Sequence, residues 1–188
     1  MSTPYELTSN QRETYRRFAR LALPRHTSYP TAPVWRSEYT PAEFEEDLRL
    51  LHRRSNPISL YVHLPFCRQL CYYCACTKEI ISDVARKKVD PADELLHGLA
   101  LEASQVAHLI EGLPAQQIHL GGGSPTFLHS EQLVRLWEIL SSHFPPTPTA
   151  EIAVEIDPRV TTADQLTTLK QLGFNRISLG VQDFDERV

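Results

Sequence analysis

The four cysteines of this 188-residue chain lie together between Cys67 and Cys76, in the run HLPFCRQLCYYCAC. A disulfide framework spreads its cysteines so that bridges close long loops, and this cluster does not. We therefore expect one metal site. The spacing C-x3-C-x2-C lets a loop hold three corners of a 4Fe–4S cube and leaves the fourth iron open to a substrate. A structural zinc ion bound by all four thiolates is the alternative.

A glycine turn, Gly121-Gly122-Gly123-Ser124-Pro125, follows a predicted strand. Glycines let a backbone approach a ligand closely and expose its N–H groups. The turn lacks the glycine spacing of a dinucleotide fold and the lysine of a P-loop. Binding of a small molecule is one interpretation, and a plain strand-to-helix turn is the other.

Polar side chains also end the next two predicted strands. Two-residue periodicity places Glu155 on one strand face with Ala153 and Asp157. A carboxylate near the carboxyl end of a barrel strand indicates a functional role, whereas the alternative is a solvated strand end. Gln182 ends the last predicted strand, where its amide could donate and accept hydrogen bonds or simply be polar.

Four short segments are predicted as strands, at residues 58–64, 116–122, 150–157 and 176–182. Helices predicted at residues 91–110, 130–142 and 161–172 separate them. This alternation is typical of an α/β fold with parallel strands, either a doubly wound sheet or a TIM-like barrel. No helix follows the last strand, so we expect a piece of a longer protein.

The first 40 residues are mixed in character. A helix is predicted at residues 11–23, with Tyr15, Phe18 and Leu21 on one face, and LPRHTSYPTAPVW then indicates irregular extended chain. Thr40, Pro41 and Glu43 form the start of another helix, whose apolar stripe is Phe44, Leu48 and Leu51.

Composition narrows the class. Apolar residues make up 41% and charged residues 22%, as in an ordinary globular domain. The net charge of −4 gives no basic field for nucleic acid, and no apolar run is long enough to cross a membrane. The N-terminus has no apolar stretch like that of a signal peptide, so we expect a reducing, cytoplasmic location in which thiols stay free for metals.

The cysteine motif, with an aromatic residue before its third cysteine, resembles the radical S-adenosylmethionine (radical SAM) superfamily. YVHLPFCRQLCYYCAC together with the upstream PRHTSYPTA is similar to the oxygen-independent coproporphyrinogen III oxidase family. The resemblance runs from about Leu23 to the end of the chain. It implies a partial TIM-like barrel over residues 56–188, preceded by an extension over residues 1–55 that carries a substrate-side arm, with the remaining strands and a helical domain lying outside the sequence.

The resemblance also implies roles for individual residues. Cys67, Cys71 and Cys74 would bind the 4Fe–4S cluster, and Cys76 would be essential without ligating iron; a small buried thiol is the other interpretation of Cys76. The residues implied to contact S-adenosylmethionine, bound as two molecules, are Tyr61, Tyr73, Gly122, Gly123, Ser124, Glu155 and Gln182. For Tyr61 and Tyr73, the alternative interpretation is that they are aromatic packing residues. Threonine is common in the family where Ser124 stands, and the hydroxyl is kept.

Arg25, His26 and Tyr29 of the PRHTSYPTA arm are hydroxyl or cationic donors for a substrate with four propionates. The family usually has tyrosine in place of His26, and a plain connecting strap is the alternative for each of the three. The remaining histidines, His63 and His119 among them, are predicted to be structural.

The implied reaction is the oxidative decarboxylation of coproporphyrinogen III to protoporphyrinogen IX, in haem synthesis without oxygen. It requires an electron-donor protein and a final acceptor, and we expect a monomer. The haem-chaperone branch of the superfamily is the close alternative. It lacks the PRHTSYPTA arm and usually has an aromatic residue in place of Cys76. A zinc-stabilised binding module without catalysis is the alternative from another class.

Overall fold

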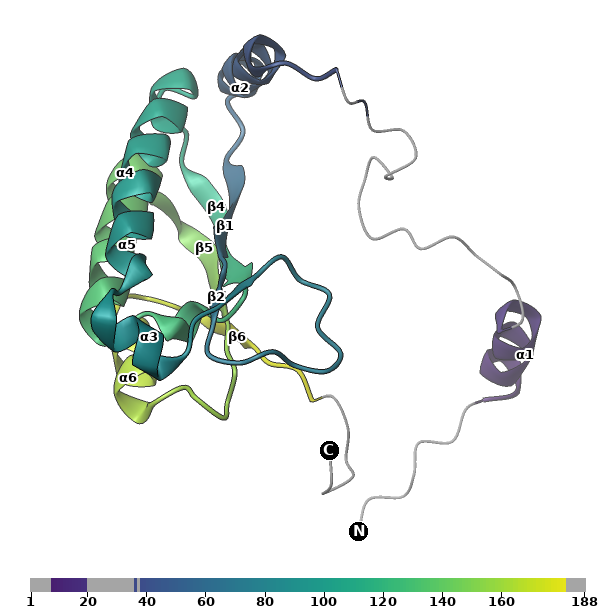
Figure 1. Cartoon of the computed structure of the whole chain (residues 1–188). Coiled ribbons are helices and arrows are strands. Elements are labelled where there is room, and N and C mark those ends of the chain that lie inside the picture. The colour runs from purple at the N-terminus through teal and green to yellow at the C-terminus, as the bar shows by residue number, and fades with distance from the viewer. Residues whose placement is uncertain (1–7, 20–35, 37, 182–188) are drawn as a thin grey trace. The chain divides into compact units, whose positions relative to one another are not determined.

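The computed structural model describes residues 8–19, 36 and 38–181 and divides the chain into two units, residues 1–40 and 41–188 (Figure 1). In the first unit, helix α1 (Ser9–Phe18) begins two residues before its predicted start. The reason is a capping box, in which Thr8 and Gln11 each accept a hydrogen bond from the other's backbone N–H. Leu21 lies outside the described residues.

The second unit opens with α2 (Pro41–Arg54), which begins at the predicted proline. Of its apolar stripe, only Leu48 packs against the core. Phe44 and Leu51 are 48% and 40% exposed, so the stripe is only partly used. The predicted boundary between residues 55 and 56 stays a prediction.

Four parallel strands form the sheet in the order β1 (Ile58–Leu64), β4 (Ala115–Gly122), β5 (Pro146–Glu155) and β6 (Arg176–Ser178). Each overlaps a predicted strand, although β5 is shifted towards the N-terminus and β6 ends four residues before the predicted Gln182. The α/β class with parallel strands is thereby confirmed.

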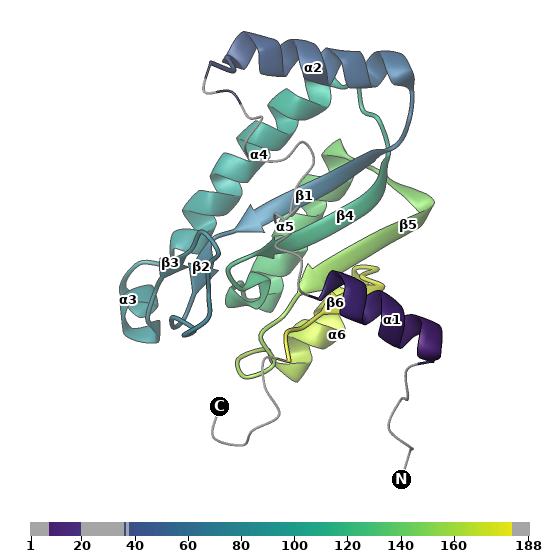
Figure 2. The same ribbon diagram turned by 90° about the vertical axis from the view of Figure 1, so that its right-hand side faces the viewer.

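The strands are joined by α4 (Pro91–Leu109), α5 (Ser130–His143) and α6 (Ala163–Gln171), all close to their predicted bounds. Figures 1 and 2 show α4 and α5 packed on the same face of the sheet. The strand order follows the chain order without a reversal. A doubly wound sheet would reverse its order and carry helices on both faces, so the arrangement is that of a barrel segment.

The helix-facing side of the sheet forms the core. Val62 and Leu64 of β1, Ile118 and Leu120 of β4, and Val154 of β5 are at most 5% exposed and point towards the helices. Strand residues alternate between faces, so the intervening residues lie on the side that α4 and α5 leave open. In β1 and β4 these residues include Tyr61, His63 and His119.

Four short elements between β1 and α5 were not predicted. β2 (Phe66–Cys67) pairs in parallel with β3 (Glu79–Ile80), and α3 (Asp83–Lys88) follows. The 3-10 turn η2 (Pro125–Phe127) follows β4. The β2–β3 pair closes the base of the cysteine loop, so a two-residue ladder holds both of its ends.

A largely buried ion pair between Arg86 and Asp90 follows this loop in the sequence. Arg86 of α3, 7% exposed, donates to Asp90 at 3.0 Å, to Gln132 at 2.9 Å and to the carbonyl of Phe127. Its guanidinium also lies over the ring of Phe127, 4.1 Å from the centroid. The network ties α3 and the start of α4 to α5 and η2.

This network predicts an acid-sensitive contribution to stability. Partial burial alone raises the pKa of the Asp90 carboxyl, but hydrogen bonds from the Ala92 N–H, Arg86 and Gln132 outweigh it and hold the pKa below its usual value. A pKa lowered by folding stabilises the native state above the unfolded-state pKa of about 3.9, and this contribution is lost as pH falls through the folded-state pKa. In the Asp90→Asn variant, the free energy of unfolding should fall less steeply below about pH 4 than in the wild type. Urea denaturation at a series of pH values measures this difference. Identical acid limbs for the two proteins would contradict this account.

Candidate functional site

The candidate site lies at the carboxyl edge of the sheet. Figure 2 shows the ends of β1, β4 and β5 together at one edge, from which the loops to the next elements leave. Leu64 of β1 pairs with Gly122 of β4, so the segment leading to the cysteines runs beside the glycine turn. Parallel barrels build their sites at this edge, as the sequence predicts here.

The first three cysteines are half-buried free thiols. A turn closed by the Cys74 N–H and the Cys71 carbonyl, 3.1 Å apart, brings two of them together. Burial raises the pKa of the Cys67 thiol, and the neighbouring Cys74, Cys71 and Cys76 raise it further. Among the described residues, no three His, Cys, Asp or Glu side chains converge on one metal ion. Three thiols within electrostatic reach of one another suit a cationic iron–sulfur group, which would relieve their repulsion as thiolates.

Cys76 is exposed, so the interpretation of this residue as a small buried thiol is wrong. Its surroundings connect it to the site. Desolvation raises the pKa of its thiol, as do Cys74 and Glu155, while Lys78 lowers it. The role of Cys76 without iron ligation remains a prediction.

The glycine turn is explained by close backbone approach. An alanine Cβ at Gly123 would lie 2.7 Å from the Pro65 carbonyl oxygen, and one at Gly122, where φ is +110°, would lie 2.7 Å from the His63 ring. The N–H groups of Gly123 and Ser124 donate to the carbonyls of Leu64 and Phe66 at 2.8 and 2.9 Å. These two N–H groups extend the ladder past β1, so they are not free to donate to a ligand.

The hydroxyl of Ser124 is buried and begins a chain of contacts. Its Oγ lies 3.4 Å from Thr126 Oγ1, which is 2.7 Å from Thr161 Oγ1. Thr161 in turn donates to the Asp157 carbonyl at 2.7 Å. The turn after β4 is thus fastened to the loop after β5.

The open face of the sheet carries a polar cluster around Tyr61 and Glu155. The Tyr61 ring stacks on His119, with centroids 5.9 Å apart, and the Tyr61 hydroxyl lies 3.1 Å from His63 Nδ1. His119 Nε2 lies 3.2 Å from Glu155 Oε1. Desolvation raises the pKa of the Tyr61 hydroxyl, and the charge of Glu155 adds to this.

Both histidines were predicted to be merely structural, and both instead orient residues predicted to bind the cofactor. His63 Nε2 also lies 2.9 Å from the Thr77 carbonyl, beside Cys76 in the sequence. The signal in the sequence was position: two-residue periodicity places His63 and His119 on the same faces of their strands as Tyr61 and Gly121.

Sequence reasoning also missed Arg159, in the loop after β5. Arg159 donates to both carboxylate oxygens of Asp157, at 2.9 and 2.7 Å, and its Nη2 lies 3.2 Å from Cys71 Sγ. The hydrogen bonds from Arg159 hold the pKa of the Asp157 carboxyl below its usual value. The signal in the sequence was the Asp-Pro-Arg run directly after a strand that ends at the site.

Other predicted site residues are placed as follows. Tyr73 lies in the cysteine loop and is 56% exposed. Gln182, Arg25, His26 and Tyr29 lie outside the described residues.

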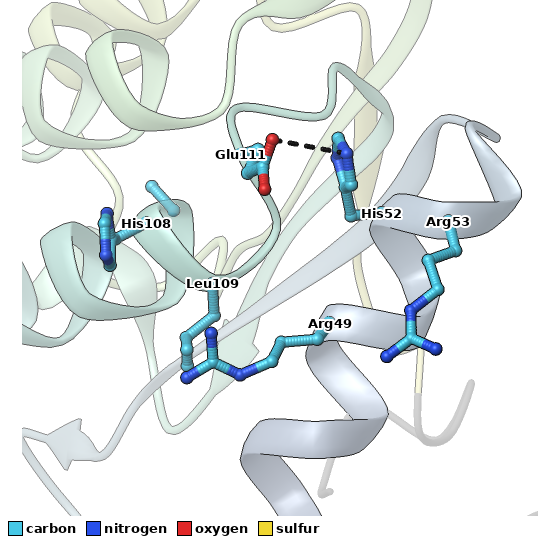
Figure 3. A pocket seen from close by; sticks show the side chains of 7 residues that line it. Arg49, His52, Arg53, His108, Leu109 and Glu111 are labelled. Atoms are coloured by element: carbon cyan, nitrogen blue, oxygen red, sulfur yellow. Dashed lines mark ion pairs between the residues drawn. The ribbon is translucent and has the colours of Figure 1, made fainter.

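A pocket of about 580 Å³ lies elsewhere, between α2 and the end of α4 (Figure 3). Arg49, His52 and Arg53 line one side and His108 and Glu111 the other, with His52 and Glu111 3.3 Å apart. α2 leads into the beginning of β1 and α4 into the beginning of β4. The pocket is therefore at the amino edge of the sheet, opposite the cysteines.

None of the helices in the described part of the chain combines the length and hydropathy needed to span a bilayer.

Comparison with curated proteins confirms the resemblance that the motifs indicate. The chain is 41% identical over 165 residues to the oxygen-independent coproporphyrinogen III oxidase of Escherichia coli and 40% identical over 167 residues to that of Synechocystis. The Pseudomonas aeruginosa protein of the same name is 42% identical over 171 residues. These matches cover 88–89% of this chain but only 35–36% of the relatives' length.

A solved structure, described as E. coli coproporphyrinogen III oxidase, a radical SAM enzyme, superimposes with a TM-score of 0.74. The match covers 86% of this chain and 36% of that one, at 41% identity. The family model of the radical SAM superfamily matches residues 61–188, which include the cysteine loop, the glycine turn and Glu155. The chain belongs to the radical SAM superfamily.

Proposed function

We propose that this chain supplies the part of an oxygen-independent coproporphyrinogen III oxidase that binds the cluster and S-adenosylmethionine. The observation that carries the proposal is the meeting of the three-cysteine loop, the glycine turn and Glu155 at one edge of a parallel sheet, in a chain about 40% identical to enzymes of that name. The chain spans about a third of those relatives, so the activity belongs to the proposal.

Membership of the superfamily implies a 4Fe–4S cluster and S-adenosylmethionine. Cys67, Cys71 and Cys74 would hold the cluster, which when bound supplies the electron for reductive cleavage of S-adenosylmethionine. The half-buried carboxylate of Glu155 would accept from the amine or ribose hydroxyls of that cofactor, and His119 orients it.

The finer assignments follow the resemblance. Binding of two S-adenosylmethionine molecules would involve Tyr61, Tyr73, Gly122, Gly123, Ser124, Glu155 and Gln182. Cys76, which is exposed, would serve the reaction rather than the iron. Arg25, His26 and Tyr29 would meet the propionates of coproporphyrinogen III, two of which become vinyl groups.

The partner proteins and setting belong to the same proposal: an electron-donor protein, a monomeric state and a cytoplasmic location. Two other functions compete. The family match counts against a zinc-stabilised binding module. A haem chaperone is disfavoured by the PRHTSYPTA arm and by cysteine at position 76.

A chimera tests the reaction directly. The aligned segment of the E. coli relative is replaced by this chain, and the purified protein is assayed anaerobically with coproporphyrinogen III, S-adenosylmethionine and a reductant. We expect protoporphyrinogen IX and 5′-deoxyadenosine from the chimera and neither from its Cys71→Ala variant, because that variant lacks a cluster ligand. A chimera that holds its cluster and cleaves S-adenosylmethionine without decarboxylating the porphyrinogen would contradict the substrate assignment. Tight haem binding by that protein would favour the chaperone.

A further inference from the structure

The loop after β5 reaches back to the cysteine loop. Cys71 and Arg159 are 88 positions apart in the sequence, yet Arg159 Nη2 lies 3.2 Å from Cys71 Sγ. No backbone pairing joins Arg159 to that loop, so the side-chain contact itself makes the link. A guanidinium facing a thiolate forms a charge-assisted hydrogen bond.

The guanidinium is held in place by its own loop. Asp157 accepts from Arg159 Nε at 2.9 Å and from Nη2 at 2.7 Å, a bidentate pair. Asp157 also accepts from the Arg159 backbone N–H at 3.0 Å. The planar fork of arginine can satisfy both carboxylate oxygens and still present Nη2 to the sulfur, which lysine cannot do.

The loop that carries the pair is fastened at several points. The Asp157 carbonyl accepts from the N–H groups of Val160 and Thr161 at 3.2 and 3.0 Å, and from the Thr161 hydroxyl at 2.7 Å. Thr161 continues through Thr126 to Ser124 of the glycine turn. Arg159 therefore extends from a closed turn whose position is set by the rest of the site.

We propose that Arg159, held by Asp157, is a positioning residue that hydrogen-bonds the Cys71 thiolate and raises the reduction potential of the cluster. The inference rests on the proposed function, since it requires that Cys71 ligate iron. The reduced cluster carries one more negative charge than the oxidised cluster, and hydrogen bonds to cluster sulfurs are among the factors that set its potential. A cation at the sulfur stabilises the reduced form more, so its loss should make reduction harder.

The test compares Arg159→Gln with Arg135→Gln after anaerobic reconstitution with iron and sulfide. Arg135 is a matched control, because its side chain is 52% exposed against 50% for Arg159 and pairs with Asp93 on the helix surface, away from the cysteines. The readout is the midpoint potential from an EPR-monitored redox titration, with iron and sulfide content measured alongside.

We expect Arg159→Gln to keep its cluster and to show an about tenfold lower ratio of reduced to oxidised cluster at a fixed poise, equivalent to about 59 mV for one electron. Arg135→Gln should match the wild type. Arg159→Lys keeps the charge, so the midpoint potential of its cluster should lie between those of Arg159→Gln and the wild type. If Arg159→Gln assembles no cluster, Arg159→Lys is compared with the wild type in its place. A cluster in either Arg159 variant with the wild-type potential would overturn the inference alone. Failure of the wild-type chain to assemble any cluster would overturn the proposed function, and this inference with it.

Discussion

Replacement of Gly123 by alanine should destabilise the fold and remove most of the bound iron after reconstitution. The new Cβ would lie 2.7 Å from the Pro65 carbonyl oxygen and 2.8 Å from that of Phe66. These neighbours are backbone atoms, which cannot rotate away as a side-chain end can. The hydrogen bonds from Gly123 to Leu64 and from Ser124 to Phe66 would be strained by the same shift.

The effect reaches the metal site because Phe66 directly precedes Cys67 in β2. Overpacking of this kind costs about 1–3 kcal/mol or more, so we expect that loss in urea denaturation and a matching fall in iron per chain. Gly98→Ala is the control. Gly98 lies in α4, where an added Cβ would have no neighbour within 4 Å, so alanine there should stabilise the helix by about 0.5–1 kcal/mol. A Gly123→Ala protein with wild-type stability and iron content would show that the close approach is unimportant.

Replacement of Arg86 by methionine should cost about 3–5 kcal/mol of unfolding free energy. Methionine keeps much of the apolar volume but removes the guanidinium donors of Arg86 to Asp90, Gln132 and the Phe127 carbonyl. The partly buried Asp90 carboxylate then keeps only the neutral donors of Ala92 and Gln132. The loss should also loosen the cysteine loop, because the Phe127 ring packs against Phe66 with centroids 5.3 Å apart.

Arg135→Met is the matched control for this variant. Arg135 also pairs with an aspartate, Asp93, but both side chains are more than half exposed, so its loss should cost less than about 1 kcal/mol. The double variant Arg86→Met/Asp90→Ser should recover part of the loss, because serine retains the helix cap without a charge. Equal destabilisation by Arg86→Met and Arg135→Met would contradict the assigned role of the buried pair.

The strand and helix order could be predicted because it depends on local patterns. Alternating residues in ISLYVHL, and the spacing of Leu133, Leu136 and Leu140, are properties of neighbouring positions. The cysteine loop was equally visible, since its residues lie within one short run. The predicted extension of the last strand to Gln182 was wrong, because β6 stops at Ser178. All three residues of β6 are exposed, so no buried contact stabilises a longer strand.

The contacts that organise the site could not be predicted in this way. Arg159 meets Cys71 across 88 positions, Arg86 meets the Phe127 carbonyl across 41, and His119 meets Glu155 across 36. Each contact depends on which loops the sheet brings to one edge and on the side-chain geometry there. Periodicity can place one member of such a pair on a face of its strand, but it does not identify the partner. The glycine turn shows the same limit: the sequence left open whether its N–H groups face a ligand, and in the structure those of Gly123 and Ser124 donate to backbone carbonyls.

The most direct test of the central claim is the EPR spectrum of this chain, reconstituted anaerobically with iron and sulfide and then reduced, with and without S-adenosylmethionine. The account predicts about four irons and four sulfides per chain and a spectrum that changes when S-adenosylmethionine is added, because three cysteine ligands would leave one iron open to it. Cys71→Ala should lose the cluster and Cys76→Ala should keep it. One zinc per chain without an iron–sulfur spectrum, or a spectrum indifferent to S-adenosylmethionine, would contradict the account.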